Sequence, residues 1–485
     1  MAISAACVWE VRQGGSSSNG GGYVSGGVDY SLQTAAQLTV TDGAATGTTN
    51  LNSVTGGFTS NMVGNIVNVV GQGRKQITAY VDTNNVTCDS AWGTFSGATV
   101  KVGGCLNLPS IILGTTPVAV PGNTVYVGDD ANYALGATTE TIGADGDSSG
   151  WIKVIGYHIG GSRTDADIAE ASMPVFTTAT NSVANFTLTG ATCLMFRNIK
   201  VTHTAATRGR GWVNATTASS HVKWVNCVCD GNLDGWYFTG ASTTSCAFKT
   251  YVGCQAKNCA ASGNAGFVDI ESSGNVNISR YINCIAHSNG NDGFQIIGST
   301  ASTAAGFVLI NCIASGNGRD GLRVAGTSVT TQGVHISNMT FYGNTTTGLN
   351  IQNSSGVIPL TLMNCIFYNT NTGISCATAS INGHFFQFKN AFGGNSTADR
   401  NVNTPAGYGD IALSGDPFTN AGSRDFSLDN TASEGAACRG VGYPAKVGIY
   451  DDTTATYLDV GAAQVQASAA GGLLTHPGMS GGMRA

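Results

Sequence analysis

The segments NCIAHSNGNDGFQII (283–297) and NCIASGNGRDGLRV (311–324) decide the fold, because they are two copies of one pattern. In each copy an Asn-Cys-Ile strand is followed by a turn rich in Asn and Gly and then by a Gly-led apolar strand. A fixed period of 20–50 residues indicates one supersecondary unit that is stacked many times. Further copies of the pattern occur at 226–238, 253–270, 338–351 and 364–376.

Equivalent residues recur at intervals of 26–30 residues, which predicts columns of like side chains. A looser second Asn column precedes the marker Gly of each copy by four residues; it contains Asn289, Asn317, Asn344 and Asn369. Gly at the marker position fits either a turn with positive φ or a close approach of two coils. The thiol column consists of Cys227, Cys254, Cys284, Cys312 and Cys365, and Met339 takes one further place in it. The first Asn column consists of Asn226, Asn283, Asn311, Asn338 and Asn364.

The repeat unit is predicted to be a coil of a parallel β-helix. Its apolar runs have three to six residues and no 3.6-residue periodicity, so they indicate short strands rather than helices. Stacked coils lie roughly 4.8 Å apart, which lets like side chains pack and amides bond along the axis. The general rule for parallel crossovers makes the helix right-handed. We expect an all-β chain with about ten coils by this spacing.

Composition excludes several classes of function. The net charge is −6 and no Lys/Arg cluster occurs, which argues against nucleic-acid binding. No apolar run reaches 18 residues, so no membrane span is expected. The N-terminus lacks a basic n-region and a long h-region, so no signal peptide is predicted.

Fourteen cysteines leave three interpretations open. The favoured one is a file of buried thiols that act as small apolar groups. Disulfides between adjacent coils have the required spacing but the wrong side-chain direction. A metal site needs four convergent ligands rather than a line of single ones, so neither a metal nor a cofactor is predicted.

Changes of texture along the chain predict four regions. Residues 1–118 contain a strand and a small, mostly antiparallel β module that would cap the first coil and attach to a particle. Residues 119–395 form the β-helix. Residues 396–466 break the rhythm and are predicted to be a C-terminal β cap, and 467–485 an extended tail.

The coils resemble the right-handed β-helix proteins of the pectate-lyase-like superfamily, whose repeats commonly combine Asn-x-Ile with Asp-Gly-apolar. The opening VWEVRQGGSSSNGGGYVSGGVDYS (8–31) and the segment at 57–89 are similar to parts of tailed-phage structural proteins. DPFTN (416–420), RDFSL (424–428), LDVGA (458–462) and HPGMSGGMR (476–484) resemble the ends of such proteins. The resemblance implies location in a virion, production in the host cytoplasm with release by lysis, and a homo-oligomer, with a trimer favoured.

Relatives on this fold that cleave polysaccharides use pairs of carboxylates. Asp269 and Glu271 alternate along one strand and are therefore the first catalytic candidates. The favoured interpretation of this pair is nevertheless two edge carboxylates that bind water or a cation. Asp234 is a weaker candidate, with Asp292 and Asp320 in equivalent places before the marker Gly. The favoured interpretation of these three residues is ordinary Asp-Gly turn chemistry.

Aromatic residues near the first clear coils are candidates for stacking on sugars. They are Trp212, Trp236 and Tyr237, although the favoured interpretation is that the Trp side chains fill gaps in the first coils. The favoured hypothesis is a virion structural protein, such as a fibre, spike or decoration, that binds other virion proteins through its N-terminal module and C-terminal tail. Its β-helix would contact a host surface polysaccharide. There are two alternatives. The first is a tailspike-type depolymerase, which would be a hydrolase or a lyase, and the second is a bacterial surface adhesin.

Overall fold

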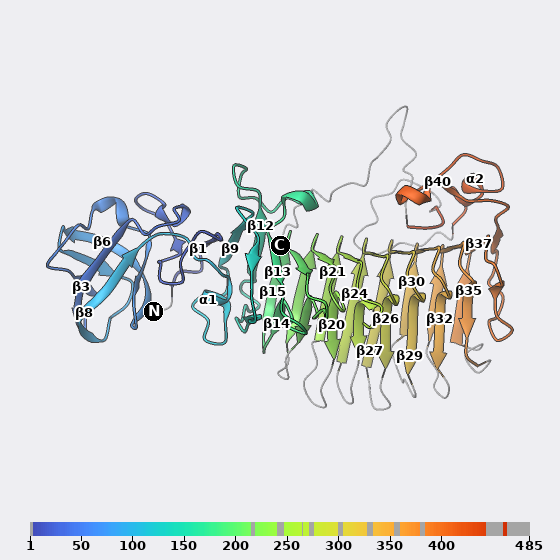
Figure 1. Cartoon of the computed structure of the whole chain (residues 1–485), viewed down its shortest axis with the longest axis horizontal. Helices are drawn as coiled ribbons and strands as arrows, with labels where there is room; N and C mark the ends of the chain where they lie inside the picture. Colours follow the sequence, from blue (N-terminus) through green and yellow to red (C-terminus); the bar gives the residue numbers. More distant parts are fainter. Residues whose placement is uncertain are drawn as a thin grey trace. The chain divides into compact units, whose positions relative to one another are not determined.

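The chain, drawn in Figure 1, divides into two compact units. Unit 1 contains Met1–Thr178 and Asn185–Val201, and unit 2 contains Ala179–Ala184 and Thr202–Ala485. Glu271 and the predicted tail at 467–485 lie outside the described residues. The computed structural model describes residues 3–214, 219–239, 247–263, 265–270, 276–298, 304–326, 333–353, 359–378, 384–442 and 459–462.

Unit 1 contains a closed antiparallel β-barrel in the region where the sequence predicted an antiparallel module. Alternating apolar residues of its strands, such as Val67, Val69 and Val100, turn inward and form a buried core with Leu51 and Trp92. The barrel strands in chain order are β3 (Leu38–Thr46), β4 (Asn50–Asn52), β5 (Ile66–Val69), β6 (Gly73–Asp82), β7 (Asn85–Cys88) and β8 (Thr94–Val102).

Unit 1 also contains the opening coils of a parallel β-helix. The segment at 8–11, which the sequence assigned to the N-terminal module, is the first rung, because it pairs in parallel with β9. The far edge of this rung is covered by β2 (Gly22–Tyr23), which pairs with it antiparallel, and by Leu106, whose N–H bonds to the Glu10 carbonyl. The rungs are β1 (Val8–Val11), β9 (Thr124–Gly128), β12 (Ile152–Tyr157) and β15 (Thr192–Arg197).

Shorter elements complete unit 1. Two further pairs of parallel strands form the other sides of its coils. They are β10 (Tyr133–Ala134) with β13 (Val175–Thr178), and β11 (Glu140–Ile142) with β14 (Phe186–Leu188). The helical turns are η1 (Tyr30–Leu32), η2 (Ser60–Met62), α1 (Ser110–Leu113) and η3 (Glu170–Ser172). The boundary between the units falls within β16 (Lys200–His203).

Unit 2 is a right-handed parallel β-helix with three sheets, as the repeat predicted. Sheet 1 contains β18 (Ser220–Val225), β21 (Ala247–Val252), β24 (Val276–Ile282), β27 (Ala304–Ile310), β30 (Gly333–Ser337), β33 (Leu360–Met363) and β36 (Phe385–Phe388). Sheet 2 contains β19 (Val228–Asp230), β22 (Gln255–Lys257), β25 (Ile285–His287), β28 (Ile313–Ser315), β31 (Thr340–Tyr342), β34 (Ile366–Tyr368), β37 (Ala391–Gly393) and β39 (Ile411–Ala412). Sheet 3 contains β17 (Trp212–Asn214), β20 (Trp236–Thr239), β23 (Ala265–Ile270), β26 (Asp292–Gly298), β29 (Asp320–Gly326), β32 (Thr347–Asn353), β35 (Thr372–Cys376) and β38 (Ala398–Arg400).

The first Asn column forms the bend between sheets 1 and 2. All five of its residues have left-handed backbones, with φ between 49° and 56°, and Gly253 takes the same place in one coil. Asn tolerates this conformation better than other non-glycine residues, which explains its recurrence. The next position in each coil is fully buried and holds a Cys in five coils and Met339 in one, and each of these Cys Sγ atoms donates to the carbonyl two residues earlier at 3.3–3.6 Å. The thiols therefore lie in one file inside the coils.

The second Asn column forms an amide ladder. Asn289 Nδ2 donates to Asn317 Oδ1 at 2.9 Å, and Asn317 Nδ2 donates to Asn344 Oδ1 at 2.8 Å. Asn369 was expected to continue this column, but it is exposed. Its coil has one residue fewer in the turn, and the register of β31 and β34 places Thr370 next to Asn344 instead.

The marker glycines are required by the close approach of coils rather than by positive φ. Gly321 has no left-handed backbone, but a Cβ there would lie 2.7 Å from the carbonyl oxygen of Gly348. Gly348 is in the same position relative to Gly373, again at 2.7 Å. Any larger residue would push neighbouring coils apart.

The described part of the predicted C-terminal cap packs on the outer side of sheet 2 (Figure 1). Phe418 and Phe426 contact the ring of Tyr342, and Arg424 reaches Ser288 at 3.2 Å. The reason is that this side of sheet 2 presents Ile and Tyr side chains that need cover. The elements are β40 (Phe418–Asn420), η5 (Ala421–Ser423), β41 (Asp425–Leu428) and α2 (Gly435–Cys438).

Candidate functional site

The two tryptophans that were candidates for sugar stacking lie inside the coils. Trp212 and Trp236 have no exposed surface. The Trp236 ring stacks on Phe267 with centroids 4.6 Å apart, and Trp212 meets Trp224 edge to face. The expectation that they bind glycans is therefore wrong, because burying an indole among aromatic rings leaves no face for a ligand.

Asp269, the first catalytic candidate, also points inward. It is fully buried, its Oδ1 contacts the Lys249 ammonium, and its Oδ2 accepts a hydrogen bond from the Tyr281 hydroxyl. Asp269 is the neighbour of Phe238 in the previous coil and of Ile296 in the next. A polysaccharide cannot reach this carboxylate, so the predicted role in an outer groove is wrong.

Asp234 and Tyr237 lie on either side of Arg210. Arg210 Nε donates to Asp234 Oδ2 at 3.0 Å, and the Ala265 N–H donates to Asp234 Oδ1 at 3.2 Å. The Arg210 guanidinium also lies 3.4 Å above the ring of Tyr237, which is half-buried. Asp234 thus joins two coils, and a cation–π contact occupies one face of the tyrosine that was expected to stack on sugar.

Asp292 and Asp320 form a pair of carboxylates on neighbouring coils. Arg319 Nε donates to Asp292 Oδ1 at 2.7 Å and lies 3.5 Å from Asp320 Oδ2, so one guanidinium serves two carboxylates. Asn350 Nδ2 donates to Asp320 Oδ2 at 2.8 Å, and the Asp320 N–H donates to Asp292 Oδ1. Both carboxyls are buried, whereas the Arg319 side chain is 35% exposed.

Burial raises the pKa of both Asp292 and Asp320 above the ordinary value, because a desolvated carboxylate is less stable. Arg319 opposes this rise at both positions. A raised pKa favours the protonated form that a general acid needs. These contacts nevertheless have an evident structural role, since the Asp side chains bridge successive coils. The turn interpretation implied a structural role for these residues, but not the bridge between coils.

A row of side chains that sequence reasoning missed runs along the outer side of sheet 1. Two of its side chains are clearly exposed: Phe386, which is 55% exposed, and Arg280. Burial lowers the pKa of His335, which favours its neutral form near pH 7. The pairing register aligns the outer row one residue per coil: Lys223, Thr250, Arg280, Val308, His335, Thr361 and Phe386. Counting alternate residues of each strand from the thiol file could have found it.

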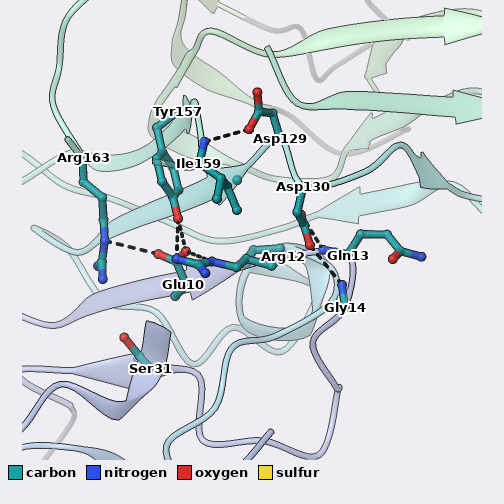
Figure 2. Close-up of polar contacts among 12 residues, drawn as sticks. Glu10, Arg12, Gln13, Gly14, Ser31, Asp129, Asp130, Tyr157, Ile159 and Arg163 are labelled. Carbon is teal, nitrogen blue, oxygen red and sulfur yellow. Dashed lines mark hydrogen bonds and ion pairs between the residues drawn. The ribbon is translucent and has the colours of Figure 1, made fainter. Parts of the chain in front are cut away.

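Unit 1 contains a buried charged cluster around Glu10, shown in Figure 2. Glu10 is fully buried and accepts from Arg12 Nε at 2.6 Å and from the Tyr157 hydroxyl. Arg163 lies 3.4 Å from the other Glu10 oxygen and 3.2 Å from Asp29. Burial raises the Glu10 pKa, and Arg163, Tyr157 and Arg12 oppose the rise.

The Glu10 cluster is structural, because its carboxylate lies close to both Arg12 and Arg163 and has no exposed surface. It ties the segment that contains Arg163 to the first rung. Nearby, Asp130 accepts from the N–H groups of Gln13 and Gly14, and Asp129 accepts from that of Ile159 (Figure 2). Glu10 and Tyr157 are far apart in the chain, so no local motif could have indicated this cluster.

A shallow hollow of about 390 Å³ in unit 1 is lined by hydroxyl side chains. Its lining residues are Ser110, Gly114, Thr115, Thr116, Thr139 and Thr141. The adjacent Glu140 is buried and accepts from both the N–H and the hydroxyl of Ser110 at 3.0 Å. Its carboxylate is therefore used to hold α1 and does not face the hollow as a free base.

Within the described ranges, no group of three or more His, Cys, Asp or Glu side chains is arranged to hold a metal ion. No helix in those ranges is long and apolar enough to cross a membrane.

Comparison with known proteins identifies the fold. No protein-family model matches the chain, and no curated protein matches it. The crystal structure of pectate lyase Pel9A matches 70% of this chain and 88% of its own, with 18% identity and a TM-score of 0.50. The chain therefore has a parallel β-helix fold like that of this pectate lyase.

Two other similar structures align less well. The GH136 lacto-N-biosidase from Eubacterium ramulus matches 64% of each chain with 10% identity and a TM-score of 0.38. ORF18 of Geobacillus virus E2 matches 60% of this chain and 53% of its own, with 11% identity and a TM-score of 0.26. At these identities the likeness concerns architecture alone.

Proposed function

We propose that the chain is a structural protein of a tailed-phage particle, and that its β-helix is a rigid scaffold that binds host surface polysaccharide without cleaving it. The observation that carries the proposal is that each described candidate carboxylate has a structural partner. Asp269 lies in the core, Asp234 is held by Arg210, and Asp292 and Asp320 share Arg319. A hydrolase needs one carboxyl as acid and another free to act as base or nucleophile.

The outer row of sheet 1 supports the binding part of the proposal. It is straight along the coil axis, with one side chain every 4.8 Å or so, which suits a linear polymer. Phe386 offers an exposed ring for stacking, and Lys223 and Arg280 supply positive charge. None of the row's seven positions is acidic, so an acidic polysaccharide is the favoured ligand.

The resemblance of both chain ends to phage proteins supports the virion part. The low content of charged residues and the many Gly, Ser, Thr and Asn residues suit a protein built mostly from stacked coils. We further propose that unit 1 attaches to other virion proteins and that the protein forms a homotrimer.

The experiment is a pair of assays on the full chain with purified host capsular polysaccharide. Titration calorimetry measures binding, and reducing-end and ultraviolet assays measure hydrolysis and lyase cleavage. We expect saturable binding and no new chain ends. Arg280→Ala and Phe386→Ala should each weaken binding about tenfold, or ~1.4 kcal/mol.

Val402→Ala is a matched control, because Val402 is fully exposed but outside the row. Equal affinity of all three variants and wild type would remove the row from the proposal. Mass spectrometry of purified particles tests virion location, and light scattering of the free protein tests the trimer.

Depolymerase activity is the second candidate, and the raised pKa of Asp292 and Asp320 is the observation that favours it. If polysaccharide is cleaved, Asp320→Asn should lower the rate by at least about a hundredfold, as expected for loss of a general acid. Cleavage that survives this substitution would place catalysis elsewhere.

A further inference from the structure

The interior of unit 2 contains a charged pair in apolar surroundings. Lys249 on β21 and Asp269 on β23 are 1% and 0% exposed. The Lys249 Nζ contacts Asp269 Oδ1, and the hydroxyl of Tyr281 on β24 donates a hydrogen bond to Asp269 Oδ2. The three groups come from two successive coils and from facing sheets.

Aromatic rings and aliphatic side chains exclude water from this pair. The Lys249 Nζ is 5.5 Å from the centre of the Phe238 ring. Tyr281 stacks on Tyr251 at 4.7 Å and meets Phe267 edge to face at 5.7 Å. Among the described residues, the rungs beside Asp269 contribute Phe238 and Ile296, and the rungs beside Lys249 contribute Val222 and Ser279, all four of them buried.

A buried ion pair of this kind does little for stability, since two apolar side chains of equal volume serve as well or better. Water-poor surroundings favour neutral forms over charged ones. Transfer of one proton from the ammonium to the carboxylate yields an amine and a carboxylic acid already in contact. The Lys249 amine is then a nucleophile in contact with the Asp269 carboxyl group. Because the two groups are already held together, their reaction does not need a collision in solution.

We propose that Lys249 and Asp269 condense to an isopeptide bond that covalently joins β21 to β23. The Nζ lone pair attacks the Asp269 carboxyl carbon, and negative charge develops on Oδ2. The Tyr281 hydroxyl already donates to this oxygen and stabilises it, as an oxyanion donor does. Oδ1 leaves as water with the transferred proton and one more proton from nitrogen, and Oδ2 remains as the amide oxygen.

The reaction balances without an oxidant or co-reactant, because the ammonium and carboxylate become one amide and one water molecule. Tyr281 is unchanged at the end. The product replaces two buried charges by a neutral amide, which removes the desolvation cost of the ion pair.

Intact mass spectrometry of the denatured full chain tests the proposal directly. We expect a mass lower than that of the processed sequence by one water molecule. Trypsin should fail to cut after Lys249, so that residues 224–257 remain joined to residues 258–280. Wild-type protein with the full sequence mass, and with free peptides ending at Lys249, would overturn the proposal.

Loss of water at an Asp-Gly succinimide gives the same mass change and must be separated from the cross-link. The chain has Asp-Gly at Asp42, Asp145, Asp230, Asp234, Asp292 and Asp320. Fragmentation that places the loss on a linear peptide would refute the cross-link, whereas a branched peptide with the branch at Asp269 supports it.

Two variants test the chemistry. Lys249→Arg keeps the positive charge but lacks the amine, so it should have the full sequence mass, and a retained water loss in it would refute the assignment. Tyr281→Phe keeps the ring and removes the hydroxyl, so the cross-linked fraction should grow more slowly after refolding. An unchanged rate would exclude Tyr281 from the reaction.

Discussion

Replacing Asn317 by Ala should destabilise unit 2 strongly, because this side chain is the middle of the amide ladder. Its Oδ1 accepts from Asn289 Nδ2 at 2.9 Å and from the Asn289 N–H at 3.3 Å. Its Nδ2 donates to Asn344 Oδ1 at 2.8 Å and to the Ala286 carbonyl at 3.2 Å. Each bond is worth roughly 1 kcal/mol net, and lost partners stay buried, so we expect a loss of about 3–6 kcal/mol.

The assay is guanidinium denaturation followed by circular dichroism, with hydrogen–deuterium exchange of residues 283–324 as a local measure. Asn369→Gly is the control, since Asn369 is exposed with φ 55° and glycine tolerates that backbone. We expect it to change stability by at most about 0.5 kcal/mol.

Asn317→Asp separates hydrogen bonding from packing. It keeps the shape of the side chain but turns an acceptor oxygen toward Asn344 Oδ1 and the Ala286 carbonyl, so it should destabilise at least as much as Asn317→Ala. The ladder argument fails if Asn317→Ala costs no more than the Asn369 control, or if Asn317→Asp restores wild-type stability.

Three further predictions follow from burial and charge. Asp320 binds protons more tightly in the folded than in the unfolded protein, so its contribution to stability should fall as pH rises from its ordinary pKa of 3.8 through the raised value. Asp320→Asn should therefore flatten this part of the curve of denaturation midpoint against pH. An unchanged slope would contradict the raised pKa. Burial raises the pKa of the Cys284 thiol well above 9.0, so iodoacetamide should label it only after denaturation, and rapid labelling of native protein would refute the buried file. Arg163→Ala should destabilise unit 1 by about 1–3 kcal/mol, because Glu10 loses one of its cations; full stability in thermal melts would show that Arg12 alone suffices.

The repeat made the architecture predictable from sequence. Strand length, the bend at each Asn and the thiol file all follow from residues within one coil, and the same local rules apply in every coil. The Asn bend illustrates this, since its left-handed backbone at Asn283 and Asn311 reflects a preference of Asn itself. The amide ladder was predicted up to Asn344 and then missed, because a turn shortened by one residue changes the register.

The candidate sites were far less predictable. Alternation along a strand groups Asp269 with Phe267, but it does not say which group faces the interior. In the structure Asp269 and Phe267 both point into the interior of the coil, and so does Trp236, so none of them can line an outer groove. Arg280 and Phe386 instead lie on the outside.

The sequence by itself determined that short strands wind into stacked coils with columns of Cys and Asn, because each coil repeats the same local preferences. Only the tertiary structure decided which side chains face solvent, which carboxylates share an arginine, and that the C-terminal hairpin covers sheet 2. The physical reason is that these outcomes depend on contacts between residues far apart in the chain. Glu10 with Arg163 and Tyr342 with Phe418 are such contacts, formed where folding happens to bring a charge to a countercharge or an apolar face to a cover.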